Sequence, residues 1–204
     1  EEATAAADAA DKELDVVKAA VSEANEAVDT KSGEALAAEA AGKVAEELTG
    51  LPSFDDPGEP GYLEDEAKLV ASMKKVVLAA LGMAAQKFGQ GLKDQQEVLA
   101  DAADICMEAY ACESALLRTL KKASKDGEEA AQPMADMLVL YTHDAMDRVG
   151  KWARNIMAAT VTGDELRTML AGLRRLTKHD PVNRTHLHDL IAERVVKAEG
   201  YTVQ

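Results

Sequence analysis

The chain has 204 residues, of which 47% are hydrophobic but only 3% aromatic, and its formal net charge is −14. Residues 1–61 hold 16 Asp and Glu against 4 Lys and Arg, which leaves residues 62–204 with 21 against 19. An acidic front end argues against nucleic acid as a partner, because phosphate would be repelled. The Ala-, Leu-, Val- and Met-rich composition suits close helix packing, and no alternating strand pattern is present. We therefore expect an all-α protein.

Three regions follow one another along the chain. Residues 1–49 form an acidic Ala/Glu-rich segment with high helix propensity and only a thin apolar stripe. Residues 50–61, GLPSFDDPGEPG, contain three prolines and three glycines and are predicted to be a linker. Residues 62–204 are predicted to be a helical bundle domain of four to five main helices, and no stretch looks apolar enough to span a membrane.

Helix boundaries in the bundle domain follow from breaks in the apolar periodicity. The first helix is expected over residues 62–87, and a long second one over 94–126 after a break at two glycines. The third is expected to start near Pro133, with the proline in its first turn, and to run to residue 160. Thr162 and Glu165 have capping-box spacing for a fourth helix, which Asp180-Pro181 should end, and a fifth starts near Asn183.

The second helix is the most regular stretch, with two stripes on different faces. We expect its apolar stripe to face the core, and its acidic stripe to be solvated or paired with Lys and Arg. A di-iron carboxylate site would need Glu-x-x-His on two helices, and the residue three positions before each of the four histidines is not acidic. The apolar stripe is Val98, Ala102, Ile105, Ala109, Cys112 and Leu116; the acidic stripe is Asp94, Glu97, Asp101, Asp104 and Glu108.

Few other residues suggest chemistry. Cys106 and Cys112 lie about 120° apart around one helix and are expected to be two small buried side chains. His143 and Asp147 are one turn apart and could form a hydrogen bond.

A basic surface is predicted near the C-terminal end. It is a candidate for contact with anionic lipid or with the chain's own acidic front, and the alternative is an ordinary solvated helix end. Its Lys and Arg residues are Arg167, Arg174, Arg175, Lys178 and Arg184.

Several segments, taken in order, resemble the C-terminal helical extension of the large acyl-CoA dehydrogenases, the very-long-chain type and its bacterial relatives. They cover roughly residues 45–204. They are LPSFDD at 51–56, QKFG at 86–89, the long run 94–119, LRTMLAGLRRLTKHDPVN at 166–183 and EGY at 199–201.

The resemblance implies an accessory domain of an FAD-dependent acyl-CoA dehydrogenase of fatty acid β-oxidation. The family's flavin cradle and catalytic glutamate belong to other domains, and Glu97, Glu108 and Glu113 do not match that motif. We therefore expect no catalytic, cofactor-binding or metal residue in this chain, and FAD in the parent enzyme.

The resemblance also implies partners and a location. The partner would be the dehydrogenase core of the same or another chain, and the protein would form a homo-oligomer. The location would be the bacterial cytoplasm, with peripheral contact to the inner membrane through the basic surface. The alternative is a free-standing helical binding or scaffold protein, since the acidic front is foreign to the family.

Overall fold

The computed structural model describes residues 42, 61–200 and 202–203 of the chain. The predictions for the Ala/Glu-rich segment 1–49 and for nearly all of the linker 50–61 lie outside these residues. The chain divides into two units, Glu1–Ala40 and Ala41–Gln204, and the helices below belong to the second.

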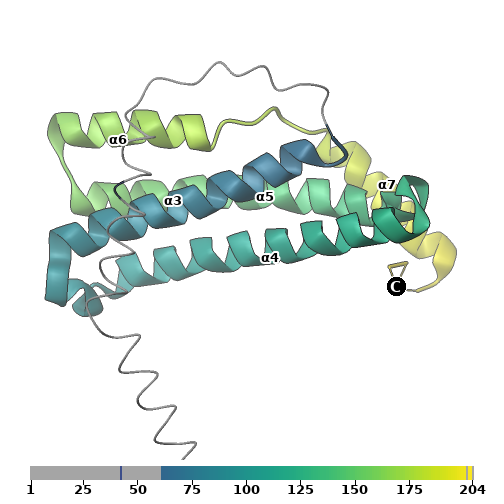
Figure 1. Ribbon diagram of the computed structural model, residues 1–204, viewed down its shortest axis with the longest axis horizontal. Helices are drawn as coiled ribbons and strands as arrows, with labels where there is room; N and C mark the ends of the chain where they lie inside the picture. Colours follow the sequence, from purple (N-terminus) through teal and green to yellow (C-terminus); the bar gives the residue numbers. More distant parts are fainter. Residues whose placement is uncertain (1–41, 43–60, 201, 204) are drawn as a thin grey trace, which may run out of the picture. The chain divides into compact units, whose positions relative to one another are not determined.

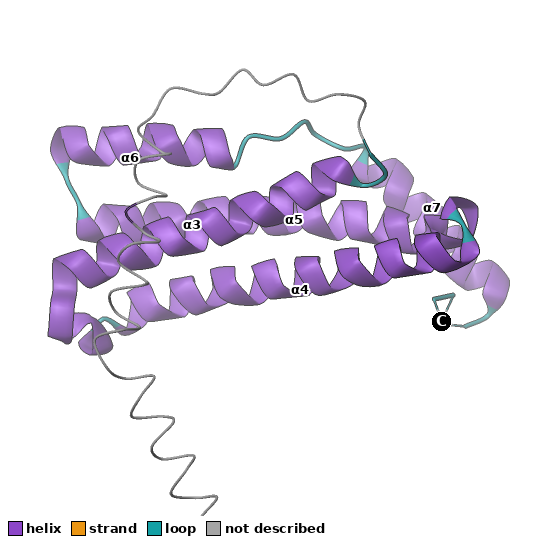
Figure 2. Ribbon diagram, viewed as in Figure 1, coloured by secondary structure: helices purple, strands orange, loops and turns teal. Residues whose placement is uncertain are grey.

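The described part of the chain is built from helices, as expected (Figure 2). No strand occurs among residues 61–200, so the prediction of an all-α bundle is confirmed. A 3₁₀ helix, η1 (Gly89–Asp94), forms the predicted break at two glycines. The five α-helices are α3 (Glu64–Phe88), α4 (Gln96–Asp126), α5 (Glu128–Thr160), α6 (Gly163–Leu176) and α7 (Arg184–Ala198).

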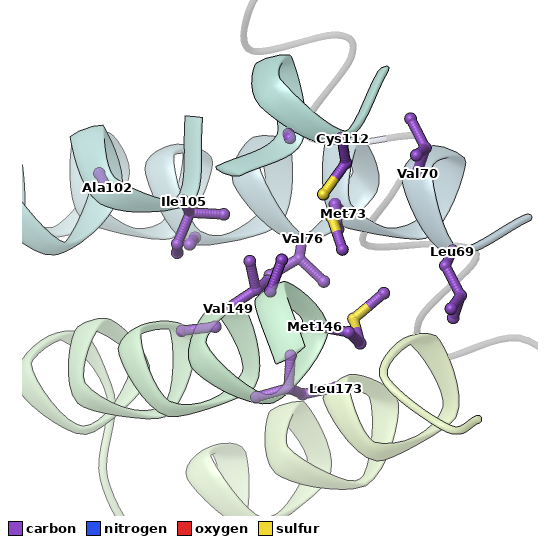
Figure 3. Close-up of a cluster of buried hydrophobic side chains, with 14 of the residues drawn as sticks. Leu69, Val70, Met73, Val76, Ala102, Ile105, Cys112, Met146, Val149 and Leu173 are labelled. Carbon is purple, nitrogen blue, oxygen red and sulfur yellow. The ribbon is translucent and has the colours of Figure 1, made fainter. Parts of the chain in front are cut away.

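Helix α5 is the centre of the bundle. It packs against α3, α4, α6 and α7, and α3 also contacts α4 and α6 (Figure 1). Figure 3 shows how side chains from α3, α4, α5 and α6 meet in one core, with Met73, Ile105, Val149 and Leu173 among them. The core is therefore made of Ala, Val, Leu, Ile and Met, as the low aromatic content indicated.

The apolar stripe of α4 is confirmed in every position. Val98, Ala102, Ile105, Ala109, Cys112 and Leu116 are all buried, and Thr119 extends the stripe by one turn. Cys106 is exposed, so the prediction of two buried cysteines is wrong for one of them. The reason is geometric, because Cys106 lies one residue beyond Ile105 and so about 100° away from the stripe.

A single residue, Gly127, joins α4 to α5. Its N–H donates to the Ala123 carbonyl (2.9 Å), and its own carbonyl accepts from the Ala131 N–H (3.2 Å). Helix α5 therefore begins at Glu128, five residues before the predicted start, and Pro133 lies in its second turn. Because proline has no backbone N–H, Pro133 cannot donate to the Glu129 carbonyl. This loss is tolerated because the preceding turn of α5 is exposed.

Two expectations for α6 are wrong. The Thr162 side chain makes no capping bond, although Thr162 is the residue that precedes the helix. The helix ends at Leu176, before Asp180-Pro181, because the backbone of Thr177 leaves the helical region (φ −96°, ψ 4°); its N–H and hydroxyl both donate to the Leu173 carbonyl (2.9 Å each). A loop then runs to Asn183, whose side chain accepts from the His186 N–H and starts α7 as predicted.

Helix α3 corrects the expectation about membrane spans. The stretch Glu64–Asp94 is long and apolar enough to cross a bilayer by length and composition. In the fold its apolar residues serve the bundle core, with Met73, Val76, Ala80 and Ala84 buried against neighbouring helices. A core helix passes the same test, so this is weak evidence for a span.

Candidate functional site

The acidic stripe of α4 is held at one end by a polar network with α5. The Arg148 guanidinium donates to Glu108 Oε1 (2.7 Å), and the Tyr141 hydroxyl donates to Glu108 Oε2 (2.8 Å). Arg148 also lies 5.7 Å from the centre of the Tyr141 ring. Burial opposes ionisation of Glu108, but the bonds from Arg148 and Tyr141 outweigh it and lower the pKa of the carboxyl. Glu108 is thus a fixed anion, as expected for a paired acidic stripe.

Metal ligation has no geometric basis in the described residues. Among residues 61–200 no group of three or more His, Cys, Asp or Glu side chains is placed to hold a metal ion. The acidic stripe runs along one helix and lacks a second donor set from a facing helix, which a di-metal carboxylate site requires.

Two histidines meet where the α6–α7 loop lies on α5. The rings of His143 and His179 are edge to face with centres 5.0 Å apart. His143 Nε2 lies 3.9 Å from Glu66 Oε1 of α3, and His179 Nε2 lies 3.8 Å from Asp147 Oδ1. His179 Nδ1 is 2.9 Å from the Thr177 carbonyl. Asp147 approaches His179, and His143 Nδ1 has no hydrogen-bond partner in the described part of the chain, so the predicted hydrogen bond between His143 and Asp147 does not form.

Burial sets the proton affinities of this histidine cluster. His143 is buried, and burial together with His179 lowers its pKa, so His143 favours the neutral form. Burial likewise raises the pKa of the Glu66 carboxyl. Both groups are 8% exposed, so neither can reach a substrate in bulk solvent. The cluster is suited to holding the loop on α5 rather than to acid–base catalysis.

The five predicted basic residues differ in their ion pairs. Arg167 pairs with Asp164 (2.6 Å), and Arg184 pairs with Asp144 of α5 (2.6 Å). All five are exposed. In the described part of the chain no salt bridge involves Arg174 or Lys178, so these two keep their charge available at the end of α6.

Sequence reasoning missed the long-range polar contacts of α5. Asp136 is buried and accepts from Arg194 of α7 and from Gln132, and Asp144 holds Arg184 at the start of α7. The two arginine partners lie 40 or more residues away, so helical spacing within one segment could not reveal them. One feature of the sequence could have indicated these contacts, because Asp136 and His143 lie on faces of α5 that are otherwise apolar.

The two thiols differ in environment. Burial raises the pKa of Cys112 to about 11, and burial also raises the pKa of the exposed Cys106 above its ordinary value. Neither thiol therefore has the lowered pKa of a reactive nucleophile.

Comparison with known proteins assigns this bundle to a protein family. The family described as "Acyl-CoA dehydrogenase, C-terminal domain" matches residues 72–175, which covers α4, α5 and most of α3 and α6. A Bacillus subtilis (strain 168) protein described as a probable acyl-CoA dehydrogenase is 37% identical over 171 residues, which are 84% of this chain and 28% of that protein.

A solved structure agrees with this assignment. The crystal structure of an acyl-CoA dehydrogenase from Bacillus anthracis complexed with FAD superposes with a TM-score of 0.76 at 35% identity. The match covers 84% of this chain and 29% of that one. The chain thus spans less than a third of the length of either relative. The chain belongs to the acyl-CoA dehydrogenase C-terminal domain family.

Proposed function

We propose that this chain is the helical accessory domain of an FAD-dependent acyl-CoA dehydrogenase of fatty acid β-oxidation. It packs on the flavin-carrying part of the enzyme and sets oligomer state or membrane proximity. The observation that carries the proposal is the family match over residues 72–175, combined with coverage of only 28% and 29% of the two relatives.

The described residues support a domain that has no catalytic group of its own. A glutamate that removes a proton from a substrate needs a pKa near the working pH and access to the substrate. Glu108 has a lowered pKa and is bound by Arg148 and Tyr141, and Glu113 pairs with Lys74. Glu66 has a raised pKa but is buried.

The described residues do not fit FAD. Phosphates of a dinucleotide are usually held by a glycine-rich turn between a strand and a helix N-terminus. Among residues 61–200 the glycine-rich stretch is η1, which follows α3 and not a strand. FAD therefore belongs, in this proposal, to the part of the enzyme that this chain does not match.

Mixing experiments test the association. The matching 28% is deleted from the Bacillus subtilis relative, and the remaining dehydrogenase portion is purified with its flavin. We expect the present chain to co-elute with that portion and to change its oligomeric state. The chain alone should show no flavin absorbance. Absence of binding and of any change in oligomeric state would favour the free-standing helical binding protein instead.

The second part of the proposal concerns the membrane. The exposed basic residues would make peripheral contact with a bacterial membrane from its cytoplasmic side. Arg174 and Lys178 project charge from the end of α6, and Arg175 is exposed beside them. We expect salt-sensitive binding to vesicles that contain phosphatidylserine, weakened by Arg174→Glu with Arg175→Glu.

The matched control for this test is Lys121→Glu with Lys125→Glu, which makes the same charge change on exposed residues of α4. If both double variants lose binding equally, the attraction is a property of net charge and the basic surface is not a specific contact. If neither loses binding, contact through the basic surface is disproved.

A further inference from the structure

The loop that joins α6 to α7 (Figure 1), residues 177–183, lies along one face of α5. At its start Thr177 packs on Gly150, where an added β-carbon would lie 3.7 Å from the threonine methyl group. In its middle the His179 ring meets His143 edge to face, with ring centres 5.0 Å apart. His143 and Gly150 are about two helical turns apart and therefore lie on the same face of α5. We call His143 and His179 the histidine pair.

The two ends of this loop are held without a histidine. At the start the Thr177 N–H donates to the Leu173 carbonyl (2.9 Å). At the other end Arg184, the first residue of α7, donates to Asp144 Oδ2 (2.6 Å). The middle of the loop meets α5 through the histidine pair. A change at the histidine pair can therefore release the middle of the loop while α6 and α7 stay in place.

The position of His143 beneath the loop is unfavourable for a charged ring. The side chain is 8% exposed, and its Nδ1 atom is buried without a hydrogen-bond partner among the described residues. Its Nε2 atom lies 3.9 Å from Glu66 Oε1, which is beyond hydrogen-bond distance. A protonated imidazole has two N–H donors, and here neither would have an acceptor. Because a buried charged donor without an acceptor is costly, the docked loop favours a neutral His143.

Charged groups face His143 from each element packed against it. The acids favour a protonated ring, whereas the second histidine opposes it. Asp65 and Asp147 are exposed, so water weakens their attraction. Asp144 is already paired with Arg184. The whole set is Asp65 and Glu66 of α3, Asp144 and Asp147 of α5, His179 of the loop and Arg184 of α7.

Glu66 is close to the ring but is itself a poor partner for a cation. Its carboxyl is buried, and burial raises its pKa, so Glu66 becomes neutral more readily as the pH falls. Burial first, and His179 second, lower the pKa of His143 despite the acids around it. The charges around the ring thus agree with the hydrogen-bond geometry, since both favour a neutral His143 beneath the loop.

We propose that the α6–α7 loop is a pH-sensitive element, docked on α5 while His143 is neutral and released in its middle when His143 takes up a proton. Release removes the His179 ring from His143 and opens the imidazole to water, where its N–H donors find acceptors. The inference concerns this chain alone and does not depend on the proposed role in a dehydrogenase.

Linkage gives the direction and the size of the effect. His143 has a lower pKa beneath the loop than in water, so the released state binds the proton more readily. Docking is therefore fully favourable above the ordinary value of 6.5 and weakens as the pH falls below it. At one pH unit below that value, the ratio of released to docked loop should have risen by up to about tenfold.

Pulsed electron paramagnetic resonance of the full chain tests the release. Nitroxide labels at Lys178→Cys in the loop and Lys121→Cys on α4 occupy exposed positions and report the distance between the two elements. Cys106→Ser removes the exposed thiol, and Cys112 is buried. We expect one narrow distance distribution at about pH 7.5 and an added broad one at about pH 5.5. An unchanged distribution down to about pH 5 overturns the proposal.

Replacement of the titrating ring tests whether His143 is the sensor. His143→Phe keeps an edge-to-face ring but cannot take up a proton, so the loop should stay docked at both pH values. His143→Gln makes the same test with a smaller side chain, and circular dichroism checks that each variant is folded. His188→Phe is the matched control, because His188 is exposed on α7 and its loss should leave the release unchanged. Release that persists in the folded His143 variants would show that another group is the sensor.

A third substitution separates the histidine from its acidic neighbour. Glu66→Gln removes the carboxylate near His143 Nε2, so release on acidification should persist or become larger. Loss of the release in this variant would show that protonation of Glu66 drives it and that the proposal is wrong. In the unaltered chain, histidine NMR should show His143 taking up its proton over the same pH range in which the loop is released. Protonation of His143 without release of the loop would also overturn the proposal.

Discussion

Replacement of Gly127 tests the connection between α4 and α5. A change to Ala alters the backbone energy of this residue and little else. Its φ of 92° and ψ of 158° lie in a region that is essentially restricted to glycine. An added β-carbon would meet no atom within 4 Å, so a steric clash with other residues contributes nothing. The expected loss of stability is therefore the backbone strain, about 1–3 kcal/mol.

This strain falls on the connection between α4 and α5, the two helices with the most extensive contact in the bundle. Urea unfolding followed by far-UV circular dichroism measures the loss. The melting temperature should fall by roughly 2–4 °C for each kcal/mol in a domain of this size.

The matched control is Gly91→Ala. Gly91 also has open space around its α-carbon but lies outside the positive-φ region. Its replacement should be neutral or slightly stabilising, because Ala restricts the unfolded chain. Equal effects of the two substitutions would refute the argument from backbone strain at Gly127.

Three further predictions concern the core, the histidine cluster and the thiols. Ile105→Ala should cost about 2–5 kcal/mol in urea unfolding because Ile105 is fully buried, whereas Leu117→Ala should stay within about 0.5 kcal/mol at 59% exposure. The pKa of His143 is lowered in the folded state, so the unfolded chain binds the proton more readily below the ordinary value of 6.5. Stability should therefore fall as the pH drops through that value, and His143→Gln should lessen this dependence; equal pH profiles would contradict it. Alkylation of the native chain should modify exposed Cys106 first and buried Cys112 only on unfolding, with Cys106→Ser as the control.

The sequence was sufficient for the interior of the long helices. Val98 to Leu116 on α4 repeat at helical spacing over five turns, so small local deviations cannot shift the stripe to another face. Leu166, Met169, Leu170 and Leu173 repeat at the same spacing on α6 and pack against the core. Element type and core face follow from periodicity, which is a property of the sequence alone.

Helix ends were less predictable because they depend on single hydrogen bonds. Pro133 suggested a start that the structure places five residues earlier, since the exposed first turn tolerates one missing bond. Thr162 had the spacing of a capping residue, yet its side chain makes no such bond. At Leu176 the helix is ended by Thr177, whose backbone leaves the helical region, and not by the proline further on.

The polar contacts between helices were the least predictable part of the fold. They explain why helices with small apolar side chains adopt one packing arrangement and not another. Small aliphatic side chains fill a core without strongly preferring one neighbour. Helix α5 supplies a polar group toward each neighbour or the loop beyond it. The three salt-bridged groups are matched in charge to their partners and would be left unpaired in another arrangement, whereas His143 meets His179 edge to face. The pairs are Arg148 with Glu108 of α4, Asp136 with Arg194 and Asp144 with Arg184 of α7, and His143 with His179 of the α6–α7 loop.

Different forces hold different parts of the bundle together. Helices α3, α4 and α5 share fully buried apolar residues, so their packing should depend little on salt. Helix α7 has no fully buried residue and is held on α5 largely through Asp136–Arg194 and Asp144–Arg184. Because charge pairs are screened by salt and apolar contacts are not, α7 should be the first helix to open at high ionic strength. Hydrogen exchange of α7 amides that did not accelerate with salt, relative to α4, would show that its half-buried Leu187, Leu190 and Ile191 hold it instead.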